Sequence, residues 1–138
     1  MMIKFTVLGH PIGKQRPRMC QINGCTIAYT PKQTKEYERL IRLNYKKVLK
    51  IKFEKGVPLE AEITAFFAVP KVASKRVKEA MLNEEILPTK KPDGDNITKI
   101  ILDALNGVAY HDDSQICNII FKKKFGEVPK VVVMIRKI

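Results

Sequence analysis

Two stretches of the chain alternate between apolar and polar residues, which is the pattern of a strand with one buried face. The longer stretch is Leu59–Val69, where every second residue is apolar, and the other is Met2–Leu8. Two apolar segments that flank a turn, Gln115–Phe125 and Val131–Ile138, are predicted to be closing strands. We therefore expect four strands outside any hairpin.

A hairpin is predicted over residues 18–29, because Asn23-Gly24 favours a two-residue turn between paired strands. Apolar residues at helical spacing then indicate helices. Thr30 is expected to cap the first helix, just before a proline suited to the first helical position. Gly107 is expected to end the third. The predicted helices cover residues 30–50, Ser74–Asn83 and Asp95–Asn106.

Interspersed strands and helices indicate an α+β (mixed α/β) fold, with one small domain over residues 1–138 and a β-sheet with about three helices. The pattern does not determine the strand order. Hydrophobic residues make up 45% of the chain, which is typical of a globular core. Because no apolar run approaches the roughly 18 to 20 residues of a membrane span and no signal-peptide pattern is present, a cytoplasmic protein is expected.

Positive charge is in large excess, since 26 Lys and Arg residues face 14 Asp and Glu, for a formal net charge of +12. Such a surface attracts polyanions, so nucleic acid is the favoured partner, with a solubility role as the alternative. A membrane surface is less favoured, because the lysines are spread along the chain. The three consecutive lysines at 122–124 are most simply explained as an exposed sheet edge that blocks aggregation.

The three cysteines carry little functional information. Cys20 and Cys25 flank the predicted hairpin turn, so they are expected to lie near each other across two strands. Cys117 is isolated. With no CxxC pair and no clustered histidines, reduced thiols are a better interpretation than a zinc site.

Five aspartates fall between residues 93 and 113 in a chain where acidic residues are scarce. Asp93 and Asp95 flank Gly94 at the start of the third predicted helix, where the glycine is expected to let both carboxylates converge. Asp113 follows that helix and is expected to return beside them. Carboxylates without Cys or His suit a hard cation, Mg²⁺ or Mn²⁺, which activates water and polarises a phosphate.

Structural explanations for the same residues remain open. Asp93 or Asp95 could cap the helix, and Asp95 and Lys99 could form an ordinary ion pair one turn apart. Asp112 and Asp113 could be a solvated turn. The spacing of these residues alone does not decide between these explanations and a metal site.

Basic residues near the N-terminus suggest contact with phosphates. Lys14, Arg16 and Arg18 alternate along a segment that a proline favours as extended, so their side chains are expected to project to one side. Lys90 and Lys91 directly precede the acidic turn. For this pair a solvated loop is the simpler interpretation, while the alternating set favours nucleic-acid binding.

In combination, these segments resemble the RusA family of Holliday junction resolvases, commonly encoded by phages and prophages. The matching motifs are Pro11–Arg18, Tyr29–Pro31, Lys91–Lys99, Leu102–Gly107 and Asp112–Gln115. They cover most of the chain in the family's order, and their combination is specific, whereas residues 70–90 contribute nothing to it.

The resemblance implies a homodimeric, Mg²⁺-dependent endodeoxyribonuclease that resolves four-way DNA junctions by paired symmetric nicks. Asp93, Asp95 and Asp113 would be the metal ligands and Lys99 the essential basic residue. A two-fold symmetric enzyme suits two equivalent cuts across a junction.

Two further aspartates, Asp103 and Asp112, are interpreted as supports behind the metal ligands, with local helix and turn roles as the alternatives. Two other functions stay open as well. One is a non-catalytic DNA-binding protein, and the other is a magnesium nuclease for another branched nucleic acid or for RNA.

Overall fold

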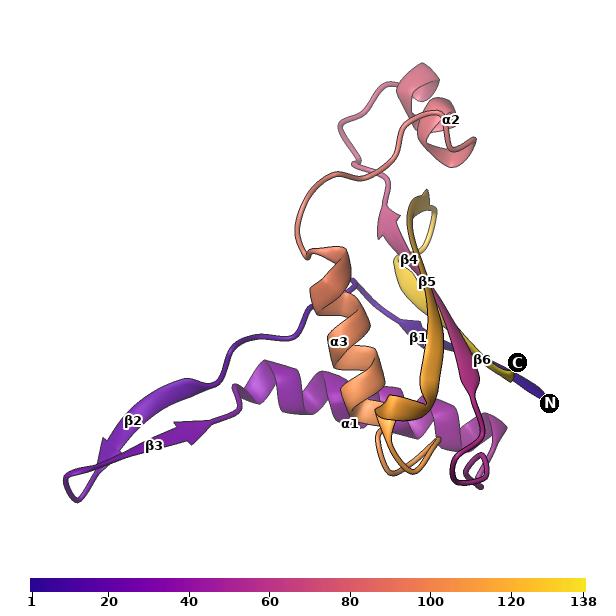
Figure 1. Ribbon diagram of the computed structural model, residues 1–138. Coiled ribbons are helices and arrows are strands. Elements are labelled where there is room, and N and C mark those ends of the chain that lie inside the picture. Colours follow the sequence, from indigo (N-terminus) through magenta and orange to yellow (C-terminus); the bar gives the residue numbers. More distant parts are fainter.

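The four strands predicted outside the hairpin form one mixed sheet in the order β1-β6-β4-β5 in the computed structural model, which describes residues 1–138 (Figure 1). The central strand β4 pairs antiparallel with β6 and parallel with β5, while β1 pairs antiparallel with β6. A parallel pair needs a long connection, and here that connection carries the second and third helices. The strands are β1 (Met2–Leu8), β4 (Leu59–Ala68), β5 (Ile116–Gly126) and β6 (Lys130–Lys137).

One face of this sheet is the core, and two helices cover it. The predicted alternation along β4 matches its burial, since Ala61, Ile63 and Ala65 are fully buried. Helices α1 (Lys32–Val48) and α3 (Gly94–Leu105) contact each other and pack against this face through their apolar stripes (Figure 1). The fold is therefore the expected single α+β domain with three helices.

The first helix begins later than predicted. Its N-terminal cap is Pro31, in an extended conformation, and no side chain donates or accepts a capping hydrogen bond. The prediction of Thr30 as the capping residue is therefore wrong. The proline occupies the cap itself rather than the first helical position, which leaves Thr30 outside the helix.

The second helix, α2 (Lys75–Leu82), lies at the far end of β4 and β5 (Figure 1). Its predicted bounds are confirmed: Ser74 is the N-cap, and its hydroxyl accepts a hydrogen bond from the amide of Val77 at 3.3 Å. None of the three helices combines the length and apolar composition that crossing a membrane requires.

The hairpin is confirmed as β2 (Arg18–Ile22) and β3 (Cys25–Tyr29), and it projects away from the sheet and helices (Figure 1). Asn23 and Gly24 both have positive φ, as a two-residue turn of this type requires. Cys20 lies opposite Ile27, whereas Cys25 lies opposite Ile22. The two cysteines are thus diagonal neighbours on one face rather than a directly opposed pair, and all three cysteines are free thiols.

Packing of α3 against the sheet should dominate stability. Ile101→Ala removes a fully buried side chain from α3 and is expected to lower the free energy of unfolding by about 2–5 kcal/mol. The matched control is Ile22→Ala on the hairpin, where the side chain is 53% exposed and the expected change is within about 0.5 kcal/mol. Urea denaturation of both variants checks this, and equal losses would contradict the assigned core.

Candidate active site

Two carboxylates at the start of α3 have no partner within the chain. Asp93 is the N-cap of this helix, yet its carboxylate accepts no capping hydrogen bond, so the capping explanation is wrong for Asp93. Asp95 lies in the first turn and makes no ion pair with Lys99, one turn later. All three side chains are exposed. The acidic turn is therefore free to bind something outside the chain.

Gly94 is required for close packing rather than for a tight turn. Its φ is not positive, but a Cβ at this position would lie 2.8 Å from the Phe121 ring on β5. This corrects the sequence-based reason for the glycine. The contact places the first turn of α3, with its two carboxylates, directly against the edge strand of the sheet.

The N-terminal segment 11–15 lies along the same turn from the other side. A Cβ at Gly13 would lie 3.0 Å from the Cβ atoms of Pro92 and Asn96, so any other residue would require these neighbours to shift. The amide of Lys14 donates a 2.9 Å hydrogen bond to the carbonyl of Asn96. The peptide bond between Lys91 and Pro92 is cis.

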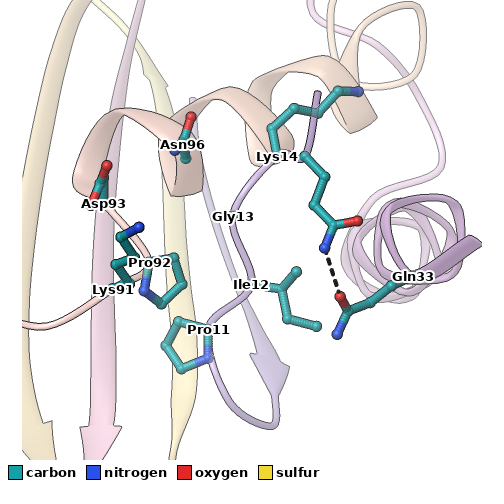
Figure 2. Close-up of a pocket in the computed structure, with 10 residues that line it drawn as sticks. Pro11, Ile12, Gly13, Lys14, Gln33, Lys91, Pro92, Asp93 and Asn96 are labelled. Carbon is teal, nitrogen blue, oxygen red and sulfur yellow. Dashed lines mark hydrogen bonds between the residues drawn. The ribbon is translucent and has the colours of Figure 1, made fainter. Parts of the chain in front are cut away.

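Between these segments lies a polar groove of ≈ 390 Å³ (Figure 2). Asp93 and Asn96 come from α3, Lys91 from the preceding loop and Gln33 from α1. The groove is therefore polar and adjoins the acidic turn. Its lining comprises Pro11, Ile12, Gly13, Lys14, Gln15, Gln33, Lys91, Pro92, Asp93 and Asn96.

The structure separates Lys14 from Arg16 and Arg18. The Lys14 ammonium lies 3.2 Å from a Glu38 carboxylate oxygen on α1 and 3.4 Å from an Asp103 oxygen on α3. Both arginines are exposed and form no ion pair. Of the predicted phosphate-binding set, the two arginines are available to an external anion, whereas the side chain of Lys14 is engaged internally.

The third aspartate of the proposed metal site sits on a well-anchored turn. Asp112 caps a short 3₁₀ helix, Asp113–Gln115, and its Oδ2 accepts a 2.8 Å hydrogen bond from the Ser114 hydroxyl. Gln115 is buried, and its side-chain oxygen Oε1 accepts hydrogen bonds from the main-chain amides of His111 and Asp112. Its side-chain amide donates to the carbonyls of residues 54 and 57, which fastens this turn to a distant loop.

Burial and neighbouring acids both raise the pKa of Asp113. Burial raises its pKa, and a side-chain hydrogen bond with Asp112 and the charges of Asp112 and Asp103 raise it further. The pKa of Asp112 is lowered, first by the hydrogen bond from Ser114 and then by one from Asp113. Asp113 therefore lies in the field of other acids, where a cation would relieve the repulsion.

The carboxylates are not gathered into a complete metal centre, since no three His, Cys, Asp or Glu side chains lie close enough together to hold an ion. The donor chemistry nevertheless fits Mg²⁺, which binds oxygen ligands, retains several waters and often uses only one or two carboxylates together with substrate phosphates. Asp93 and Asp95 have no intramolecular partner, and the pKa of Asp113 is raised by burial and by neighbouring acids.

The other lysines near the acidic turn differ in what their side chains contact. Lys91 lines the groove, while the Lys90 ammonium lies 6.0 Å from the centre of the Phe67 ring. The lysine run 122–124 lies on β5, an edge strand as predicted. Of these, Lys122 pairs with Glu62 and Lys124 with Glu84.

Sequence reasoning missed Glu38 and the anchoring role of Gln115. Glu38 gave no signal, because it lies on a helix rich in charged residues, and only the packing of α1 against α3 brings it to Lys14. Gln115 was included in a motif, but two of the four hydrogen bonds of its side chain are made to the carbonyls of loop residues 54 and 57, which are distant in sequence.

Two comparisons with known proteins bear on this site. The family described as "Endodeoxyribonuclease RusA" matches residues 9–136. A protein of Bacillus subtilis (strain 168), described as "Uncharacterized protein YqaN", is 35% identical over 138 residues, covering 99% of this chain and 96% of that protein. The family match confirms the resemblance seen in the motifs, and it spans nearly the whole chain.

Opposite pKa shifts of neighbouring aspartates predict opposite effects of pH on two matched variants. A raised folded-state pKa means that Asp113 lowers stability as pH rises from the unfolded value through the folded one. Asp113→Asn should therefore gain stability over the wild type across that interval. The pKa of Asp112 is lowered in the folded state, so its contribution to stability grows as pH rises from the folded pKa to the unfolded one. Asp112→Asn should therefore become less stable than the wild type over that interval.

Thermal unfolding between pH 3 and pH 8, without divalent ions, measures both differences. The same sign for both variants would show that the repulsion between these acids is not as described.

Proposed function

The chain belongs to the RusA family of endodeoxyribonucleases, and from that premise we propose that it is a Mg²⁺-dependent enzyme that resolves four-way DNA junctions by paired symmetric nicks. As a member of this family it is an endodeoxyribonuclease, a hydrolase that acts on Holliday junctions. The metal requirement, the residues and the mechanism given below are the proposal.

The observation that carries the proposal is the free acidic turn. Asp93 and Asp95 occupy the start of a helix with neither a capping bond nor an ion pair, in a protein with a net charge of +12. In a purely structural turn these carboxylates would be expected to pair with the abundant lysines and arginines. Unpaired carboxylates of this kind would be available to hold a divalent cation, which would polarise a DNA phosphate.

In this mechanism Asp93, Asp95 and Asp113 would hold the ion. A bound Mg²⁺ supplies a polarised phosphate and a more acidic water for in-line attack. Mn²⁺, which prefers the same oxygen ligands, is expected to substitute. The anchored turn at Gln115 gives Asp113 a defined position from which to reach a shared ion.

Lys99 would stabilise the leaving oxygen. It follows Asp95 by four residues on α3, so both lie on the same side of the helix, and it has no carboxylate partner. A fixed cation beside the reacting phosphate offsets the negative charge that develops in the transition state. Asp103 and Asp112 support the site without binding the ion: Asp103 by holding Lys14, and Asp112 by capping the turn before Asp113.

DNA binding would rely on Arg16, Arg18, Lys90 and Lys91. The two arginines emerge from the segment that borders the groove, and the two lysines precede the acidic turn. Phosphates bound by these cations would pass the carboxylates at the start of α3. Family membership also supports a homodimer, which gives two equivalent active sites for a junction with two-fold symmetry. Because the substrate is DNA, a cytoplasmic location is proposed with it.

Cleavage of an end-labelled synthetic four-way junction by the purified protein tests the proposal, with linear duplex as the substrate control. Symmetric nicks in the junction alone, present with Mg²⁺ and absent with EDTA, are the expected result. Binding without cleavage of any junction sequence would favour the non-catalytic alternative. Preferential cleavage of a flap, or of RNA, would favour the other nuclease.

Asp93→Asn should reduce the cleavage rate by about 100-fold or more while junction binding persists, because the variant loses a metal ligand but no phosphate contact. Glu127→Gln, an exposed acid in the β5–β6 turn, is the matched control and should cleave at the wild-type rate. Single-turnover kinetics measures both. A normal rate for Asp93→Asn would show that this carboxylate is not a ligand.

Arg16→Gln should weaken junction binding at low salt and reduce the slope of log K against log salt by about one, as expected for one lost phosphate contact. Arg76→Gln on α2, which replaces an exposed arginine outside the proposed DNA-binding set, should leave both unchanged. Fluorescence anisotropy in EDTA measures binding without cleavage. An unchanged slope for Arg16→Gln would remove this residue from the DNA-binding set.

A further inference from the structure

One lysine joins three segments around the acidic turn. The ammonium of Lys14 contacts Glu38 on α1 and Asp103 on α3, while its main-chain amide donates to the carbonyl of Asn96 near the start of α3. The Lys14 side chain is 21% exposed and that of Glu38 is 13% exposed. This cation is therefore largely enclosed by carboxylates of its own chain.

We propose that Lys14 is a positioning residue that holds the N-terminal segment against α3 and thereby sets the geometry of Asp93 and Asp95, rather than a DNA-binding residue. The inference rests on the proposed function, and it replaces the role in phosphate binding that its place in a basic motif suggested. In the same proposal, Glu38 on α1 is the second carboxylate, beside Asp103, that holds the Lys14 ammonium.

The connection from Lys14 to the carboxylates is short. Gly13 lies close to Pro92 and Asn96, the residues on either side of the acidic turn, since a Cβ at position 13 would come within 3.0 Å of both. The Lys14 main chain is bonded to Asn96, and its side chain is bonded to Asp103, two turns further along the same helix. Lys14 thus contacts α3 both near its start, at Asn96, and near its end, at Asp103. Through Glu38 it also contacts α1.

Charge explains why a cation is needed at this point. Without Lys14, the carboxylates of Glu38 and Asp103 would face each other across the α1–α3 contact without compensation. Their repulsion would separate the helices where they border the groove, and Gly13 would lose its fixed approach to Pro92. Asp93, which lines the same groove, would then be displaced relative to Asp113.

The same surroundings disfavour contact with DNA. Two carboxylates within 3.4 Å of the ammonium repel an incoming phosphate, and Glu38 already accepts a hydrogen bond from it. Arg16, two residues later, is exposed and unpaired. The two roles thus divide between neighbouring cations on one segment, which gives variants with separable effects.

Lys14→Met tests the inference, with Lys14→Arg as the charge-preserving variant. We expect Lys14→Met to raise the Mg²⁺ concentration for half-maximal cleavage and to slow single-turnover cleavage by about 10-fold or more, the scale for residues that orient metal ligands. Junction affinity in EDTA and its salt slope should stay at wild-type values. Lys14→Arg should restore most of the rate, because a guanidinium can also span both carboxylates.

Lys32→Met is the matched control. Lys32 belongs to the same region of the chain and pairs with Glu36 on α1, but its side chain is 90% exposed. It should change neither the rate nor the Mg²⁺ requirement. A weaker affinity with a shallower salt slope in Lys14→Met would overturn the inference in favour of phosphate contact, as would unchanged rate and Mg²⁺ dependence.

Failure of the proposed function would be distinguishable from failure of this inference. If the wild type cleaved no junction, amide hydrogen exchange at Ile97 would still test whether Lys14 holds the first turn of α3 in place. The N–H of Ile97 donates to the carbonyl of Asp93 in that turn. Faster exchange at Ile97 in Lys14→Met than in Lys32→Met supports the tether, since the first turn of α3 would be loosened. Equal exchange refutes it. If the methionine variant does not fold, Lys14→Gln, which also removes the charge, is compared with Lys32→Met in the same way.

Discussion

The close approach of two backbone segments to the first turn of α3 is the constraint on which the candidate site depends. Gly94 allows the Phe121 ring of β5 to lie against this turn, and Gly13 allows the N-terminal segment to lie against it from the other side. A side chain at either glycine would clash with these neighbours and require them to shift. The buried stripe of α3 fixes the helix on the sheet, and the two glycines fix how its N-terminus is enclosed.

The protein has two regions of opposite charge, a positively charged majority and an acidic cluster around α3. Most of the chain carries excess positive charge, which attracts a polyanion over long range. Around α3 the balance reverses, and burial together with the neighbouring acids Asp112 and Asp103 raises the pKa of Asp113. A nuclease needs both properties, because a DNA backbone must be drawn to the surface and then brought to carboxylates that would repel it without a cation between them.

Two kinds of acid occur within this cluster, and their surroundings separate their roles. Asp103 and Asp112 are committed, the first to Lys14 and the second to the turn before Asp113. Asp93 and Asp95 have no intramolecular partner at all. This difference agrees with the proposed roles, in which Asp103 and Asp112 support the site while Asp93 and Asp95 would bind the ion.

Local patterns in the sequence were enough to predict nearly every helix and strand, because period and turn chemistry act over a few residues; Asn23-Gly24 and the alternation along β4 are examples. The motif residues Asp93, Asp95 and Lys99 were also visible there. Only the tertiary structure decided the strand order, the reason for Gly94 and the internal engagement of Lys14. Each of these depends on residues distant in sequence, Phe121 for Gly94 and Glu38 for Lys14, which meet only when helices and sheet pack together.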